Sequence, residues 1–133
     1  MAHTKVQSLE EIDAALKAAT VSGWVLLQFG SPTCKLCPAF TEEASKVRER
    51  RCVDAWLYVD AHSCDDVSAA FSLRRLPAFA LLHRDHRDSS KKLDPEKVSV
   101  WQAATGPQLE MACEANGVPF RTDTRALVFT DDF

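Results

Sequence analysis

The chain has 133 residues, 46% of them hydrophobic and 26% charged, which fits one globular domain large enough to bury a core. Its net charge of −3 provides no basic stripe for phosphates, so nucleic acid is not an expected partner. No run approaches the roughly 18 apolar residues of a membrane span, and the amino terminus has no apolar signal segment. We therefore expect a monomeric domain that binds neither membranes nor nucleic acid.

The cysteines indicate the compartment. There are five, and only Cys34 and Cys37 are close together, whereas a secreted disulfide framework normally has an even number at regular spacings. The count therefore favours a reducing compartment, the cytoplasm, with the mitochondrion as the alternative. In such a compartment a two-residue spacing points to redox or metal chemistry. Cys52, Cys64 and Cys113 are interpreted as core or incidental thiols rather than catalytic ones, and Cys64 is the one we would watch for regulatory oxidation.

Strands and helices are expected to alternate through the first half of the chain. Residues 6–7 predict a short first strand, and Ser8 with Glu11 forms a capping box that opens a helix. The apolar run 24–29 lies between glycines and predicts a central parallel strand covered on both faces. After a turn, Cys34 is expected to begin the next helix.

The second half predicts a hairpin beside further helices. Residues 55–59 predict the second parallel strand, and Ser63 with Asp66 suggests a helix start. Residues 78–82 and 98–102 predict two strands joined by a long, charged, turn-rich connection. The last two strands are therefore expected to be antiparallel, whereas the earlier crossovers are parallel.

The final predicted helix sets the domain boundary. Thr105 and Gln108 form a capping box around a proline, and a glycine terminates the helix. We expect one domain over residues 1–117 and an extension over residues 118–133. Within that extension, residues 126–129 are either a docked strand or a tail.

The Cys34–Cys37 spacing lies where a buried strand gives way to a helix. Free amide groups and the positive helix end stabilise an anion there, and Lys35 adds positive charge nearby. A Cys34 thiolate could attack a disulfide, and Cys37, one turn along and more buried, could resolve the mixed disulfide. A metal site and two inert thiols are the alternatives. No ligating residue is predicted for a metal, because a zinc site usually needs a second cysteine pair or suitably spaced histidines.

These segments resemble the thioredoxin family. The resemblance is carried by the apolar strand, the turn with its two cysteines, and Leu76-Pro77 about 40 residues later. It covers roughly residues 4–116 and implies an α/β thioredoxin fold, a central mixed β-sheet with helices on both faces. It also implies that Pro77 is cis and that the backbone of Leu76 binds extended substrates.

The chain departs from the usual thioredoxin pattern around the cysteines. Thr33 stands where these proteins have tryptophan, and Lys35-Leu36 replaces Gly-Pro between the pair. Gln28 occupies the position of a buried acid, and Trp56 occupies that of a strand lysine. A carboxylate can relay the proton of the resolving thiol, whereas an amide cannot.

A further departure is Pro38, which directly follows Cys37 and withdraws one amide from the first helical turn. Together these changes predict slower or altered exchange chemistry and a narrower choice of partner. These changes leave both cysteines of the pair in place.

The resemblance implies a protein-disulfide oxidoreductase that needs no bound cofactor beyond a reversible Cys34–Cys37 disulfide. Its partners would be protein disulfides or thiols and an upstream reductant. The expected substrate-binding residues are Thr33, Lys35, Leu36, Leu76 and Pro77. The alternatives are a redox-poor binding module of the same fold and an iron–sulfur or zinc site shared between two subunits.

Overall fold

A computed structural model describes residues 3–121 and contains a five-stranded sheet with four α-helices. The strands are β1 (Thr4–Lys5), β2 (Trp24–Gly30), β3 (Ala55–Asp60), β4 (Ala78–His83) and β5 (Val100–Gln102). The helices are α1 (Leu9–Ala18), α2 (Cys37–Arg50), α3 (Asp65–Ala70) and α4 (Gly106–Asn116), with 3₁₀ turns η1 (Arg84–His86) and η2 (Pro95–Lys97) between β4 and β5. The predicted order of elements is confirmed.

The sheet is mixed, with the strand order β1-β3-β2-β4-β5. β1 and β2 pair in parallel with β3, whereas β4 is antiparallel to β2 and β5 is antiparallel to β4. The apolar run of β2 therefore lies in the middle of the sheet, where six of its seven residues are buried. This confirms the predicted central strand and the predicted hairpin.

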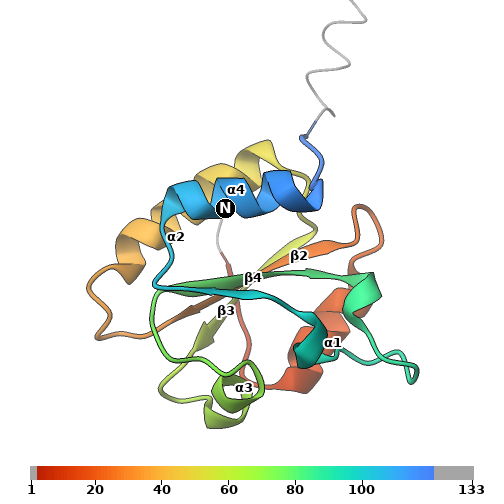
Figure 1. The fold of residues 1–133 in the computed structure, drawn as a ribbon, viewed down its shortest axis with the longest axis horizontal. Helices are drawn as coiled ribbons and strands as arrows, with labels where there is room; N and C mark the ends of the chain where they lie inside the picture. The colour runs from red at the N-terminus through yellow and green to blue at the C-terminus, as the bar shows by residue number, and fades with distance from the viewer. Residues whose placement is uncertain (1–2, 122–133) are drawn as a thin grey trace, which may run out of the picture.

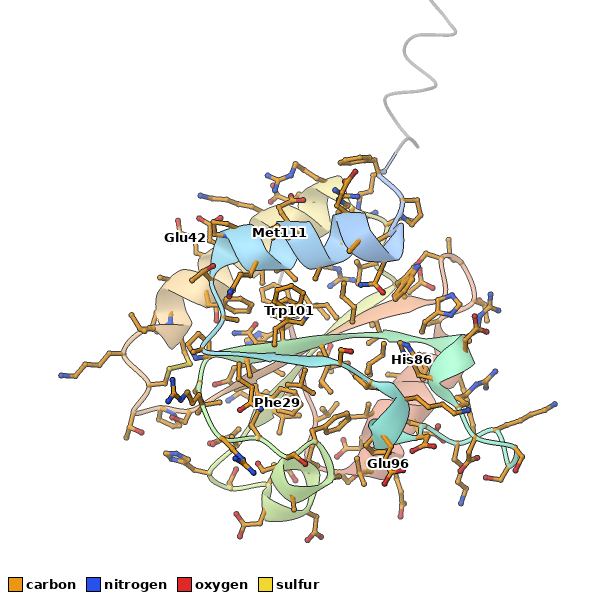
Figure 2. The ribbon with its side chains drawn as sticks, in the orientation of Figure 1. Phe29, Glu42, His86, Glu96, Trp101 and Met111 are labelled. Atoms are coloured by element: carbon orange, nitrogen blue, oxygen red, sulfur yellow. A yellow bond between two sulfur atoms is a disulfide. The ribbon has the colours of Figure 1, made fainter. Side chains whose placement is uncertain are left out.

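Helices cover both faces of the sheet, α2 and α4 on one and α1 and α3 on the other (Figure 1). Successive side chains of β2 point to opposite faces of the sheet. Val25, Leu27 and Phe29 therefore pack in the core under α1 and α3, whereas Leu26 packs in the core under α2 and α4. Figure 2 shows Phe29 on the α3 side of the sheet and Trp101 between the sheet and α4. The α/β class with helices on both faces is confirmed.

Several predicted element starts are wrong, among them that of β5, which begins at Val100 rather than at residue 98. The first strand is Thr4–Lys5 rather than residues 6–7, although the Val6 N–H still donates to the Tyr58 carbonyl at 2.9 Å. The third helix has Cys64 as its N-cap, with no side-chain capping bond, because the Ser63 hydroxyl turns back to the Asp60 carbonyl. The first strand and the third helix are short, with 2 and 6 residues, so hydrophobic periodicity gives little information on where they begin.

The end of the domain follows the predicted capping chemistry. Thr105 and Gln108 form the reciprocal capping box of α4, and Gly117 ends the helix with a left-handed φ of 69°. The next residues pack onto the end of α2, where Val118 is buried and the Pro119 carbonyl accepts from the Cys52 N–H at 2.7 Å. The strand or tail expected at 126–129 lies outside the described residues, and the boundary at 117 stays a prediction.

Within residues 3–121 no helix has the length and apolar character needed to cross a membrane.

Asp54 ties the turn before β2 to the start of β3. Its carboxylate accepts the backbone N–H groups of Val21, Ser22 and Gly23 at 3.0–3.2 Å, and the Ser22 hydroxyl at 3.0 Å. Burial raises the pKa of Asp54, but these hydrogen bonds to the ionised form outweigh it, and the pKa is lowered. The ionised carboxylate therefore stabilises the fold.

We expect Asp54→Asn to lower the free energy of unfolding by about 2 kcal/mol at neutral pH, because an amide presents donors to donors. Urea unfolding should show the full deficit above the unfolded-state pKa of about 4. The wild type loses this contribution as the pH falls through the lowered folded-state pKa, so the two proteins should converge in acid. A deficit that does not change with pH would contradict the proposed role of the charge.

Candidate active site

The two cysteines lie between the end of β2 and the first turn of α2. The loop before the helix is folded by the Cys34 N–H, which donates to the Ser31 carbonyl at 3.2 Å. The helix begins at Cys37, not at Cys34 as predicted. No side chain caps an earlier helix start, and Pro38 has the fixed φ that suits a first turn, so the helix begins beside this proline.

Cys34 and Cys37 form a disulfide, with their Cα atoms 5.4 Å apart. Cys37 is 4% exposed, whereas Cys34 is only half-buried. The difference has the direction that the predicted roles require, an accessible attacking sulfur and a protected resolving one. Those roles remain predictions.

The positive end of α2 is not neutralised by its own residues. Its first turn contains no acidic side chain, and Lys35 lies exposed in the preceding loop. A thiolate at this position would therefore be stabilised by both the helix dipole and a nearby cation. Pro38 contributes no N–H, so the sulfur site has one amide fewer than the usual first turn.

Hydrogen bonds on both sides of Leu76 hold the proline loop that precedes β4. The Leu76–Pro77 peptide bond is cis, as the resemblance implied. The side-chain carbonyl of Gln102 accepts the N–H groups of Arg74 and Arg75 at 2.6 and 2.9 Å, and the Pro77 carbonyl accepts from the backbone at 2.8 Å. By contrast, neither the N–H nor the carbonyl of Leu76 has a hydrogen-bond partner among residues 3–121.

A groove of about 430 Å³ joins this loop to Cys34, and we call it the proline-loop groove. Its lining residues are Ser31, Thr33, Cys34, Lys35, Leu36, His62, Arg74 and Leu76. It brings together four of the five predicted substrate-binding residues. The fifth, Pro77, is buried and does not line the groove.

A second cavity of about 560 Å³, the tyrosine pocket, shares only Ser31 and Cys34 with the groove. Its other lining residues are His3, Lys5, Pro32, Cys37, Pro38, Thr41, Tyr58 and Asp60. Tyr58 packs so closely over the end of β2 that a Cβ on Gly30 would lie 2.6 Å from its hydroxyl oxygen. Cys34 therefore lines both the proline-loop groove and the tyrosine pocket.

Gln28 and Trp56, the two substitutions noted on the strands, contact each other. Gln28 is fully buried, and its Oε1 accepts from Trp56 Nε1 at 3.0 Å. Its Nε2 donates to Thr41 Oγ1 at 2.7 Å. Thr41 lies one helical turn after Cys37 and lines the same pocket. Three uncharged side chains linked by hydrogen bonds therefore lie here, at the positions where the resemblance to thioredoxins would imply a buried acid and a lysine.

Sequence reasoning missed three of these residues. Thr41 follows Cys37 by four residues, a spacing that places both on one side of a helix and could have indicated it. Arg74 was treated only as part of a break between elements, although it precedes Leu76 by two. His62 was interpreted as a solvated loop residue, and it is exposed, but it lines the proline-loop groove.

The remaining cysteines line neither the proline-loop groove nor the tyrosine pocket. Cys64 and Cys113 are buried and Cys52 is partly exposed, all three as free thiols. Burial raises the pKa of Cys113 to about 11, which disfavours its thiolate. Between residues 3 and 121, no group of three or more His, Cys, Asp or Glu side chains is arranged to hold a metal ion.

No family model matches the sequence, and a search of curated proteins found no match. Solved structures do match. They include a mutant thioredoxin from Halobacterium salinarum (19% identity, TM-score 0.64, 86% of this chain and 94% of that one) and a Plasmodium falciparum thioredoxin (13%, 0.67, 88% and 88%). The thioredoxin Deadhead of Drosophila melanogaster matches at 16% identity and a TM-score of 0.63, over 86% of this chain and 98% of its own. The chain therefore has the thioredoxin fold, with a Cys-x-x-Cys disulfide at the start of α2.

Proposed function

We propose that this protein is a thiol–disulfide oxidoreductase of the protein-disulfide reductase type. The observation that supports it most is the Cys34–Cys37 disulfide, whose first sulfur borders a groove while its second is buried at a helix start. The pair can cycle between dithiol and disulfide without another cofactor. We further propose that the protein works as a monomer in a reducing compartment, the cytoplasm or mitochondrion.

In the proposed cycle the Cys34 thiolate attacks one sulfur of a substrate disulfide. A Cys34–substrate bond forms, and the other substrate sulfur leaves as a thiolate. The Cys37 thiolate then attacks the Cys34 sulfur, which closes the Cys34–Cys37 bond and releases the second substrate thiolate. The substrate gains two electrons, and an upstream dithiol or reductase returns two electrons to the protein.

The proline-loop groove supports an extended substrate segment beside Cys34. Leu76 lies at one side, and its N–H and carbonyl, which have no partner within residues 3–121, are the two groups that a strand-like peptide would bond. Leu36, 67% exposed, offers an apolar contact beside the cysteines. Thr33 and Lys35 complete the wall around the reacting sulfur.

A binding module without efficient redox chemistry is the second candidate. It is favoured by Gln28, whose buried amide is held by Trp56 and Thr41 and cannot take a proton from Cys37. This candidate keeps the groove as a recognition surface and leaves the disulfide with a structural role.

Reduction of insulin by dithiothreitol separates the two candidates. We expect micromolar wild-type protein to speed the precipitation of the insulin B chain by about tenfold or more over dithiothreitol alone, because the helix dipole and Lys35 favour the attacking thiolate. A matched Cys34→Ser/Cys37→Ser variant should give only the uncatalysed rate. If the wild type is no faster than this variant, the oxidoreductase proposal fails and the binding module is preferred.

A further inference from the structure

The charges of the proline-loop groove are of one sign. Three of its lining residues are titratable apart from the cysteine, namely Lys35, His62 and Arg74, and no aspartate or glutamate among residues 3–121 lines it. The protein as a whole has a net charge of −3, so this local excess opposes the average charge of the molecule. A surface of this kind attracts anionic partners over about a Debye length.

The two permanent cations of the groove are not neutralised within the described part of the chain. Neither Lys35 nor Arg74 forms an ion pair with any residue between 3 and 121, and both are exposed. Asp60 is the acid bonded to this region, since its Oδ1 accepts the His62 N–H at 3.0 Å, but it lines the tyrosine pocket. The positive charge of the groove is therefore available to a partner.

Apolar and backbone groups restrict the shape of that partner. Leu36 and Leu76 lie in the same groove as the cations. The N–H and carbonyl of Leu76, which bond to nothing in the described part of the chain, suit an extended backbone rather than a helix. The tyrosine pocket, by contrast, mixes His3 and Lys5 with Asp60 and offers no single sign of charge.

We infer that the proline-loop groove selects extended protein segments in which aspartate or glutamate flanks the target cysteine, a substrate class set by Lys35 and Arg74. This inference rests on the proposed function. An acidic side chain on either side of the cysteine would face a cation, whereas a lysine or arginine there would be repelled.

The test uses three peptides of one sequence around a single cysteine, flanked by glutamate, glutamine or lysine. Each peptide carries its cysteine as a mixed disulfide with uncharged 2-thiopyridine. Protein reduced beforehand attacks the peptide sulfur through Cys34 and releases 2-thiopyridone, which is followed by absorbance. At low ionic strength we expect the glutamate peptide to react about tenfold faster than the lysine peptide, with glutamine between them. High salt should compress this ratio towards one.

Arg74→Glu should reduce or invert the glutamate-to-lysine ratio. Arg74 is the better cation to change, because Lys35 also influences the thiolate of Cys34. Lys92→Glu is the matched control, since it makes the same charge change at an exposed lysine beside α1 and should keep the wild-type ratio. Equal rates with all three peptides, or equal ratios in both variants, would overturn the charge selection while leaving the oxidoreductase intact. No reaction with any peptide would overturn the proposed function and this inference with it.

Discussion

A Cys34→Ser variant is expected to lose disulfide reduction by at least about 1000-fold, because the hydroxyl that replaces the nucleophile is not ionised at neutral pH. Cys37→Ser should behave differently. Its half-buried Cys34 still attacks, but no second thiol is available to release the substrate. A mixed disulfide should therefore accumulate, and intact mass should show one substrate adduct per protein.

Two measurements test whether Cys34 attacks and Cys37 resolves. Peptide mapping of the trapped Cys37→Ser adduct should place the substrate on Cys34, and Cys52→Ser should react at the wild-type rate, because that thiol is not in the site. If Cys34→Ser instead traps substrate on Cys37 as quickly, the assignment of the two roles is reversed. The 4% exposure of Cys37 argues against that outcome.

The fold was largely predictable because its strongest signals are local. The apolar run that forms β2 can be satisfied only inside a sheet covered on both faces, and six of its residues are buried. Thr105, Gln108 and Gly117 give α4 a start and an end that tertiary contacts do not need to impose. Such features depend on neighbours a few residues away, so the sequence displays them.

The starts of β1 and α2 were less predictable for a physical reason. Both residues of β1 are exposed, and the strand exists because its backbone pairs with β3, which no side-chain pattern records. Cys34 was expected in the helix, but the loop bond to Ser31 and the absence of a capping side chain move the start to Cys37. Hydrogen bonds of the main chain decide these boundaries.

Some residues of the candidate site were also predictable from the sequence, and others were not. The two sulfurs were found from their spacing and Leu76 from the resemblance to thioredoxins, and Cys34 and Leu76 share one groove. His62 and Arg74 reach that groove from separate loops, after β3 and before β4, and no sequence interval relates them. The positive charges that Lys35 and Arg74 bring to one groove become visible only when the chain is folded, which is why the proposed choice of acidic partners required the structure.

The buried Gln28 offers a test of the proton path. Gln28→Glu is nearly isosteric, and the new carboxylate can accept from both Trp56 Nε1 and the Thr41 hydroxyl. Because the position is fully buried, desolvation should raise the folded-state pKa of that carboxyl. Stability should then fall as the pH rises from the unfolded-state pKa to the raised folded-state pKa, by about 2–4 kcal/mol in total, and level off above it.

The same substitution should accelerate the resolving step. An ionised carboxylate one hydrogen bond from Thr41 can receive the Cys37 proton, which the amide cannot, so release of substrate from the mixed disulfide should quicken by about tenfold or more once the carboxyl is ionised. Single-turnover release as a function of pH measures this step. Gln28→Met is the matched control, because it removes the amide without adding a titratable group and should produce neither the pH-dependent loss of stability nor the faster release. Equal release rates for the glutamate and methionine variants would show that a carboxylate at this position does not receive the Cys37 proton.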